Sequence, residues 1–216
     1  MNIFLFILVY LLLCNWFQLY SFLSIFIGPK YRTSSVDDKW IKAVVKKKTG
    51  LSLLDITLFN DQKVYGFMAG LPFWPKMILS KGLYTSFNKD ELEWVILHEA
   101  GHCVLWHNLQ AFIIQVGILF FGIYTVIRFN FSLFSTLGYA VFLCLVCIQI
   151  LRWGIEYSAD RYSINRVDNP KGVITAQDKF RNVSDIFRFF LYWNIYPSKR
   201  IEMAKQRIIS LKCRRI

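Results

Sequence analysis

Two histidines and a glutamate in one short stretch carry the clearest chemistry in this sequence. His98 and His102 are four positions apart, and Glu99 directly follows the first, which gives the pattern His-Glu-x-x-His. On a helix, residues four apart lie about 40° apart around the axis, so both imidazoles can reach one metal ion. Glu99 projects beside them, where a carboxylate can take a proton from a water molecule. The spacing predicts the site of a zinc-dependent hydrolase.

The residues before the motif predict the helix that the motif requires. Asn88 and Glu91 have the spacing of a capping box, and apolar residues follow at Leu92, Val95 and Ile96. A capping box satisfies two backbone N–H groups at the start of a helix. We therefore expect one helix, beginning at the capping box, to carry both histidines. Two polar residues satisfied by ordinary hydrogen bonds are the alternative interpretation.

A hydrolytic zinc site needs a third protein ligand and keeps its fourth position for water. His107 does not have the metzincin spacing after His102, and we expect it at a membrane interface instead. Glu156 is the better candidate, because Asp160 follows it four positions later and can accept the second ring N–H of a ligating histidine. An ordinary solvated helix face is the competing interpretation of these two carboxylates.

Three uncharged segments predict membrane spans and favour Glu156 as the third ligand. Residues 1–28, 108–127 and 129–151 contain no charged side chain, and each can cross about 30 Å of hydrocarbon as a helix. If the helices continue beyond the spans, His102 and Glu156 lie roughly 8 to 9 Å outside the same membrane face. The hairpin 108–151 would then return Glu156 to the histidines.

The distribution of basic residues predicts the orientation of the chain. Lysines and arginines cluster after residue 28 and again after residue 151, whereas Arg128 is the only charge between the second and third spans. Because basic residues stay on the cytoplasmic side, we expect the N-terminus outside and the site facing the cytoplasm, in the cell or inner membrane. Residues 1–28 lack the basic start and the small-residue cleavage site of a signal peptide. We interpret them as a retained transmembrane anchor.

The composition fits one membrane-embedded domain. Hydrophobic residues make up 55% of the 216 positions and charged residues only 19%, which is too apolar for a soluble domain of this size. We expect an anchor over 1–28 and one domain over 29–216, interrupted by the hairpin 108–151. The basic residues behind the net charge of +12 lie beside the spans and in the C-terminal tail, so the lipid bilayer is the expected partner and nucleic acid is not.

Between the anchor and the motif the pattern changes from helical to extended. We expect a helix over about 37–48 and strands over 51–59, 64–68 and 76–79. The predicted fold class is an α-helical membrane protein with a small α+β, zincin-like catalytic domain, about three transmembrane helices and a short antiparallel sheet beside the motif helix. An edge strand can pair with an extended peptide substrate. The segment 64–70 is the candidate for this role, although a place in the plain core explains it equally well.

The order of these motifs resembles a known family. His98-Glu-Ala-Gly-His102, two hydrophobic helices and Glu156-Tyr-Ser-Ala-Asp160 are similar to the HtpX-type membrane zinc metalloproteases, a group that also includes the CAAX prenyl proteases. Upstream, Tyr65-Gly-Phe-Met-Ala-Gly70 and Ile78-Leu-Ser-Lys-Gly82-Leu83 stand where the family has a strand ending in glycine and a Gly-Leu turn. Downstream, Tyr196-Pro197-Ser198-Lys-Arg200-Ile201 resembles the family's His-Pro segment and Arg-Ile helix.

The resemblance covers roughly residues 36–208, with three departures. The chain has one expected span before the catalytic domain where the family typically has two. Tyr65 replaces an asparagine of the edge strand, and Tyr196 replaces the histidine of the His-Pro segment. None of these changes falls on an expected zinc ligand, so they concern the positioning of substrate.

The motif and the resemblance lead to one functional hypothesis, a membrane-bound zinc endopeptidase. His98, His102 and Glu156 hold one Zn²⁺, Glu99 is the general base, and Asp160 orients a ligating histidine. Substrates would be proteins or peptides, mainly membrane-associated, and a role on misfolded proteins follows from the resemblance alone.

Two questions stay open at this level. The donor that stabilises the oxyanion is one of Tyr157, Asn165 and Arg200 by position, with no ground to choose among them. A membrane-anchored, zinc-binding regulator or scaffold without catalysis is the alternative function. Glu99 argues against it, because zinc binding does not need this residue.

Overall fold

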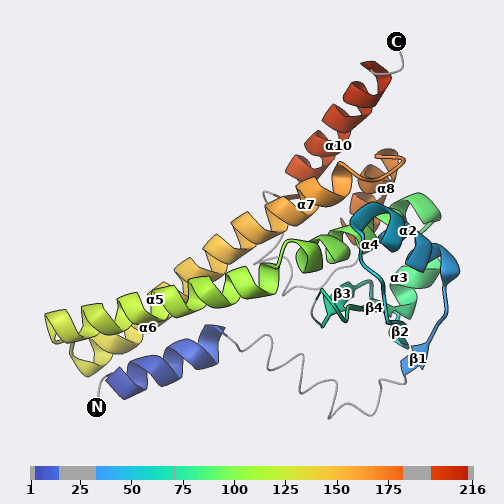
Figure 1. Ribbon diagram of the computed structural model, residues 1–216. Coiled ribbons are helices and arrows are strands. Elements are labelled where there is room, and N and C mark those ends of the chain that lie inside the picture. The colour runs from blue at the N-terminus through green and yellow to red at the C-terminus, as the bar shows by residue number, and fades with distance from the viewer. Residues whose placement is uncertain (1–2, 15–32, 71, 182–195, 214–216) are drawn as a thin grey trace. The chain divides into compact units, whose positions relative to one another are not determined.

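The computed structural model describes residues 3–14, 33–70, 72–181 and 196–213, and it divides the chain into two compact units (Figure 1). The first, here called the apolar unit, comprises Met1–Pro29 and Trp106–Tyr157. The second, here called the mixed unit, comprises Lys30–Leu105 and Ser158–Ile216. The chain therefore leaves the mixed unit once, through a hairpin, and returns to it.

The apolar unit is built on two long helices that lie side by side, α5 (His107–Phe129) and α6 (Leu133–Leu151) (Figure 1). Asn130 ends α5 in the left-handed conformation, with φ of 47°, which asparagine tolerates better than most residues. Both helices are long and apolar enough to cross a membrane. Their large side chains face outward, with Phe120 66% and Phe134 83% exposed. A helix in a soluble core would bury such residues, whereas a lipid-facing helix exposes them.

The helix Ile3–Cys14 packs into the same unit. Its Phe6 and Tyr10 are fully buried in a cluster with residues of α5 and α6. This helix comes close to α5 at Gly122, where an added Cβ would overlap the Phe6 ring. This helix is apolar but shorter than a membrane span, and residues 15–28 lie outside the described residues. Spans at the second and third predicted positions thus fit α5 and α6, while the span over 1–28 stays a prediction.

The helix before the hairpin is interrupted, which corrects the expectation of continuing helices. The helix α4 (Lys89–Val104) ends two residues before Trp106, which has a left-handed backbone with φ of 56°. This conformation is a rare and costly one for a bulky residue. The depth argument therefore fails for His102. On the other side the chain does continue, from α6 through the π-helix η1 (Arg152–Glu156) into α7 (Tyr157–Ile164).

The mixed unit contains a four-stranded sheet in the order β1-β2-β4-β3. The strands are β1 (Thr33–Ser35), β2 (Asp55–Phe59), β3 (Gly66–Ala69) and β4 (Lys76–Ser80). β1 with β2 and β3 with β4 pair antiparallel, but β2 and β4 are parallel, with Asp55 opposite Lys76. The sheet is therefore mixed, which corrects the prediction of a purely antiparallel sheet. After β2 the chain forms β3 two places away in the sheet order. The hairpin β3–β4 then brings β4 back between them, so that β4 runs parallel to β2.

Four helices join α4 in the core of the mixed unit. They are α2 (Lys39–Thr49), α3 (Lys81–Ser86), α8 (Lys171–Arg181) and α10 (Tyr196–Cys213). α2 begins at the N-cap Asp38, whose side chain accepts the N–H of Ile41, and it ends at Gly50 with a φ of 79°. α4 contacts α2, α8 and β3, and its Ile96 and Leu97 are fully buried. The unit is thus organised around the helix that carries the motif.

Candidate metal centre

The structure confirms that one capped helix carries both histidines. The Asn88 side chain accepts the N–H of Glu91 at 3.0 Å, and the Glu91 carboxylate accepts the N–H of Asn88 at 2.8 Å. This reciprocal pair fixes the start of α4 at the predicted residue. His98 follows in the third turn, so its position is determined by the cap and by the buried face of the helix.

The two imidazoles of α4 face each other in a geometry that fits a zinc ion. The Nε2 atoms of His98 and His102 are 3.2 Å apart. Two nitrogens bound to one tetrahedral Zn²⁺ at about 2.0–2.1 Å would be separated by about 3.3 Å. The observed separation fits within the tolerance of a metal bond. The pair can therefore supply two of the ligands without a change of rotamer.

Glu156 supplies a carboxylate at the same point. Ligand atoms of His98, His102 and Glu156 all lie within 4.8 Å of one another. Glu156 is the last residue of η1, the short π-helix that precedes α7. A π-helical turn is wider than an α-helical one and changes which face a residue presents, and such turns often occur at functional sites. The wide turn thus sets the position of the carboxylate.

A close approach of α4 and α7 also contributes to this geometry. A Cβ added to Gly101 would lie 3.1 Å from Cδ1 of Tyr162, which is tighter than ordinary packing. Gly101 lies between the two histidines of the motif, and Tyr162 lies on α7. The absence of a side chain at Gly101 therefore allows α7 to come close to the histidines.

Asp160 lies beside the first histidine. Its Oδ1 atom lies 2.9 Å from Nδ1 of His98, and its side chain is fully buried. A carboxylate oxygen this close to Nδ1 favours the tautomer that carries the proton on Nδ1 and leaves the lone pair on Nε2, the atom that faces His102.

Arg200 of α10 holds the other oxygen of this carboxylate. Its Nε donates to Oδ2 of Asp160 at 2.6 Å. Its guanidinium carbon also lies 5.6 Å from the centre of the Trp94 ring, and Trp94 in turn lies 6.0 Å from the His98 ring. Trp94 was missed from the sequence, although it stands one turn before His98 on the same helix and this spacing could have indicated it.

The structure also places the proposed general base, the rejected third ligand and the oxyanion candidates from the sequence. Glu99 is half-buried on α4 between the histidines. His107 is buried at the first residue of α5 and does not belong to the cluster found among the described residues. Tyr157 is exposed at the start of α7, and Asn165 accepts a hydrogen bond from Arg207 through its backbone carbonyl. None of the oxyanion candidates is distinguished by these contacts.

Two titratable side chains near the cluster have shifted pKa values. Burial raises the pKa of the Cys103 thiol, next to His102, so it behaves as a packed apolar residue. Burial also raises the pKa of Tyr162, although Arg166 over its ring acts in the opposite direction. Both groups therefore stay protonated at neutral pH, and their contribution to the centre is packing.

The motif helix, the paired imidazoles and the converging carboxylate are features of a metallopeptidase of the His-Glu-x-x-His class. The chain belongs to peptidase family M48, whose family model matches residues 32–206. This membership confirms the resemblance seen in the motifs and makes the chain a member of a metallopeptidase family.

A solved structure shares the fold. The crystal structure of S. mikatae Ste24p aligns with a TM-score of 0.57 and 17% sequence identity, over 94% of this chain and 56% of that chain. The present chain therefore spans little more than half the length of this neighbour. No curated protein matches the sequence. The family and the two long apolar helices together support a membrane metalloprotease as the general class.

Proposed function

We propose that the chain is a zinc-dependent endopeptidase that cuts membrane-associated or misfolded proteins near the membrane surface. The observation that carries this proposal is the convergence of His98, His102 and Glu156 within 4.8 Å. The family supports the reaction, because M48 is a peptidase family. In the proposed domain organisation, residues 1–28 anchor a domain of residues 29–216, which the hairpin 108–151 interrupts.

The proposed zinc ligands are the Nε2 atoms of His98 and His102 and the carboxylate of Glu156. Zn²⁺ bound there supplies a Lewis acid, which polarises the scissile carbonyl and acidifies the attacking water. Three protein ligands leave one position open for the reaction, as in other catalytic zinc sites. Asp160 keeps His98 in the required tautomer during turnover.

Glu99 is the proposed general base. It takes the proton from the attacking water and passes it to the amine that leaves when the peptide bond breaks. Its place directly after His98 on α4 keeps it beside the ligands, yet it is not needed to hold the ion. This separation of roles makes Glu99 the residue that distinguishes an enzyme from a metal-binding regulator.

The strand β3 is the proposed docking site for an extended substrate. It lies at the end of the described sheet order, it pairs with β4 on one side, and it contacts α4. A peptide added along its other side would gain main-chain hydrogen bonds. Tyr65 stands just before this strand, where the resembling family has an asparagine, so side-chain contacts with the peptide would differ.

The proposed location is the cell or inner membrane, with the centre facing the cytoplasm. The basic residues that follow residue 28 and residue 151 support this orientation. A site next to the bilayer favours substrates that are themselves held at the membrane.

Cleavage of an unfolded protein by the detergent-purified chain tests the proposal. The assay compares the wild type with added zinc, the wild type with a chelator, and Glu99→Gln with zinc. We expect cleavage only by the wild type with zinc. If neither protein cuts while both hold zinc, the chain is instead a zinc-binding regulator or scaffold.

A further inference from the structure

We propose that Arg200, on the C-terminal helix α10, is a positioning residue that sets the zinc affinity of the centre through Asp160. The inference rests on the proposed zinc site. It assigns a defined role to a residue that the sequence offered only as one of three oxyanion candidates. It also makes α10, which lies about 100 residues after the motif, part of the metal centre.

The first step is the charge of Asp160. This carboxylate is fully buried, and its two oxygens face two different partners, His98 and Arg200. A buried carboxylate needs a compensating charge and hydrogen bonds to stay in place. Nε of Arg200, at 2.6 Å from Oδ2, supplies both.

The second step is the position of the Asp160 oxygen that faces His98. With Oδ2 held by Arg200, Oδ1 is fixed 2.9 Å from Nδ1 of His98. Without Arg200, the carboxylate loses this restraint and can rotate away from His98. Rotation removes the negative oxygen that favours the lone pair of His98 on Nε2. Partners of this kind typically change metal affinity by about 10- to 100-fold.

The third step is the position of the guanidinium itself. The Arg200 side chain is 16% exposed, and its guanidinium carbon lies 5.6 Å from the centre of the Trp94 ring. An aromatic ring and a carboxylate thus restrain a planar cation from two directions. Lysine has the charge but not the planar fork, so it would fill this role only in part.

Arg207 provides a matched control on the same helix. It donates from a guanidinium nitrogen to the backbone carbonyl of Asn165 at 2.9 Å. Both arginines therefore attach α10 to the segment that contains α7. Of these two arginines, Arg200 is the one that bonds to Asp160. Replacing each by methionine separates the attachment of α10 from the positioning of Asp160.

The test measures zinc affinity by competition with a chromophoric chelator, and ligand geometry from the visible absorption of the Co²⁺-loaded protein. We expect Arg200→Met to bind zinc at least about 10-fold more weakly with an altered Co²⁺ spectrum. Arg200→Lys should recover part of the affinity, and Arg207→Met should match the wild type. Equal affinity in Arg200→Met and the wild type, or an equal loss in Arg207→Met, overturns the inference.

A second comparison keeps the test valid if Arg200→Met does not fold. The double variant Asp160→Asn/Arg200→Met removes both buried charges together and avoids an unpaired carboxylate. If Arg200 acts through Asp160, this double variant binds zinc as weakly as Asp160→Asn alone and no more weakly. A further loss contradicts the inference. Failure of the wild type itself to bind zinc would instead refute the proposed function.

Discussion

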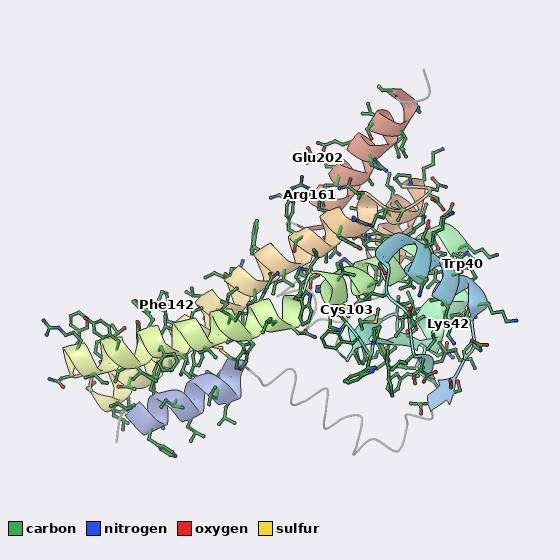
Figure 2. All side chains as sticks on the ribbon, in the orientation of Figure 1. Trp40, Lys42, Cys103, Phe142, Arg161 and Glu202 are labelled. Atoms are coloured by element: carbon green, nitrogen blue, oxygen red, sulfur yellow. The ribbon has the colours of Figure 1, made fainter. Side chains whose placement is uncertain are left out.

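Charged side chains cross the interior of the mixed unit, whereas aromatic and small side chains fill the interior of the apolar unit. In the mixed unit, Lys48 links α2 to Glu93 of α4, with both side chains at most 10% exposed. In the apolar unit, Phe6 stacks on Tyr10 and fits against Gly122. Figure 2 shows Phe142 on the hairpin, among side chains made mainly of carbon.

Under the proposed function, the two units have different tasks, which accounts for this difference. A metal centre needs several polar groups held at fixed positions away from water, which buried ion pairs and hydrogen bonds achieve at a cost in desolvation. A membrane-spanning unit has no water to compete for its polar groups and gains from close packing of small residues. The two units should therefore respond differently to substitution. The four predictions below follow from this contrast.

The largest effect is expected on the cleavage rate, from a substitution in the mixed unit that leaves its packing unchanged. Glu99→Gln should lower the rate of peptide cleavage by about 10²- to 10⁴-fold, because the general base is lost. Zinc content and thermal stability should stay unchanged, since the residue is not a ligand. Glu202→Gln, at an exposed position of α10, is the control. A Glu99→Gln protein that still cuts with zinc at the wild-type rate would refute the role.

The next effect is expected on the stability of the mixed unit. Lys48 bonds to Glu93, to Asp168 at 2.7 Å and to the carbonyl of Arg166 at 2.9 Å. Lys48→Met leaves Glu93 buried without its cation, so we expect a loss of about 3 kcal/mol in the free energy of unfolding, at the lower end for a broken buried pair. Denaturant unfolding followed by tryptophan fluorescence measures it.

The control for this prediction is an exposed pair at the start of the same helix, between Lys42 of α2 and Asp37, which precedes it. Lys42 lies 2.7 Å from Asp37, with side chains that are 36% and 69% exposed. Lys42→Met should cost far less than Lys48→Met, because solvent screens such pairs. Equal losses in the two variants would contradict the distinction between buried and exposed charge.

A smaller effect is expected in the packing of the apolar unit. Gly122→Ala places a methyl group against the Phe6 ring and 2.8 Å from a methyl of Leu143, which should cost about 1 to 3 kcal/mol. The helix Ile3–Cys14 should loosen, so oxidative cross-linking of Cys14 to Cys144, whose sulfurs are 3.3 Å apart, should slow. The control is Gly117→Ala, also on α5, where an added Cβ meets open space, so this variant should cross-link normally. Unchanged cross-linking in Gly122→Ala would argue against this packing.

The smallest effect is a pH dependence at the start of α4. Burial alone would raise the pKa of Glu91, but hydrogen bonds from Lys179, the N–H of Asn88 and Thr175 together hold the pKa below its ordinary value of 4.5. A carboxyl with a lowered pKa in the folded state stabilises the fold above its unfolded pKa. This stabilisation is lost as the pH falls from about that ordinary value through the lower folded value.

Thermal melting as a function of pH checks this prediction. Glu91→Gln keeps a capping-box side chain but not the charge, so it should melt lower at neutral pH by the equivalent of about 1 kcal/mol. Its melting temperature should also depend less on pH below 4.5 than that of the wild type. The same acid dependence in both proteins would assign it to other carboxyls.

Local signals explain which parts of the mixed unit could be predicted. The start of α4 was predicted because Asn88 and Glu91 act on their own helix, within three residues of each other. Metal-site chemistry, and not propensity, predicted that Asp160 would lie beside a ligating histidine, but not that this histidine would be His98. The strand β1 was missed, since Thr33–Ser35 is too short for a periodicity to appear.

Features that depend on distant contacts could not be predicted. The parallel pairing of β2 with β4 is decided by the position of β3, and the bond between Asp160 and Arg200 joins residues 40 apart. The left-handed Trp106 breaks a helix where the sequence contains neither glycine nor proline. For the π-helix before α7, Gly154 is the one local hint, because glycine weakens an α-helix.

The central claim is that a carboxylate from the far end of the hairpin completes a metal site begun on α4. X-ray absorption at the zinc edge of the purified chain, beside Glu156→Ala, tests it most directly. We predict two imidazole nitrogens and a carboxylate oxygen around zinc in the wild type. In Glu156→Ala the carboxylate should be lost and zinc held more weakly. An identical zinc environment and affinity in the two proteins would contradict the account.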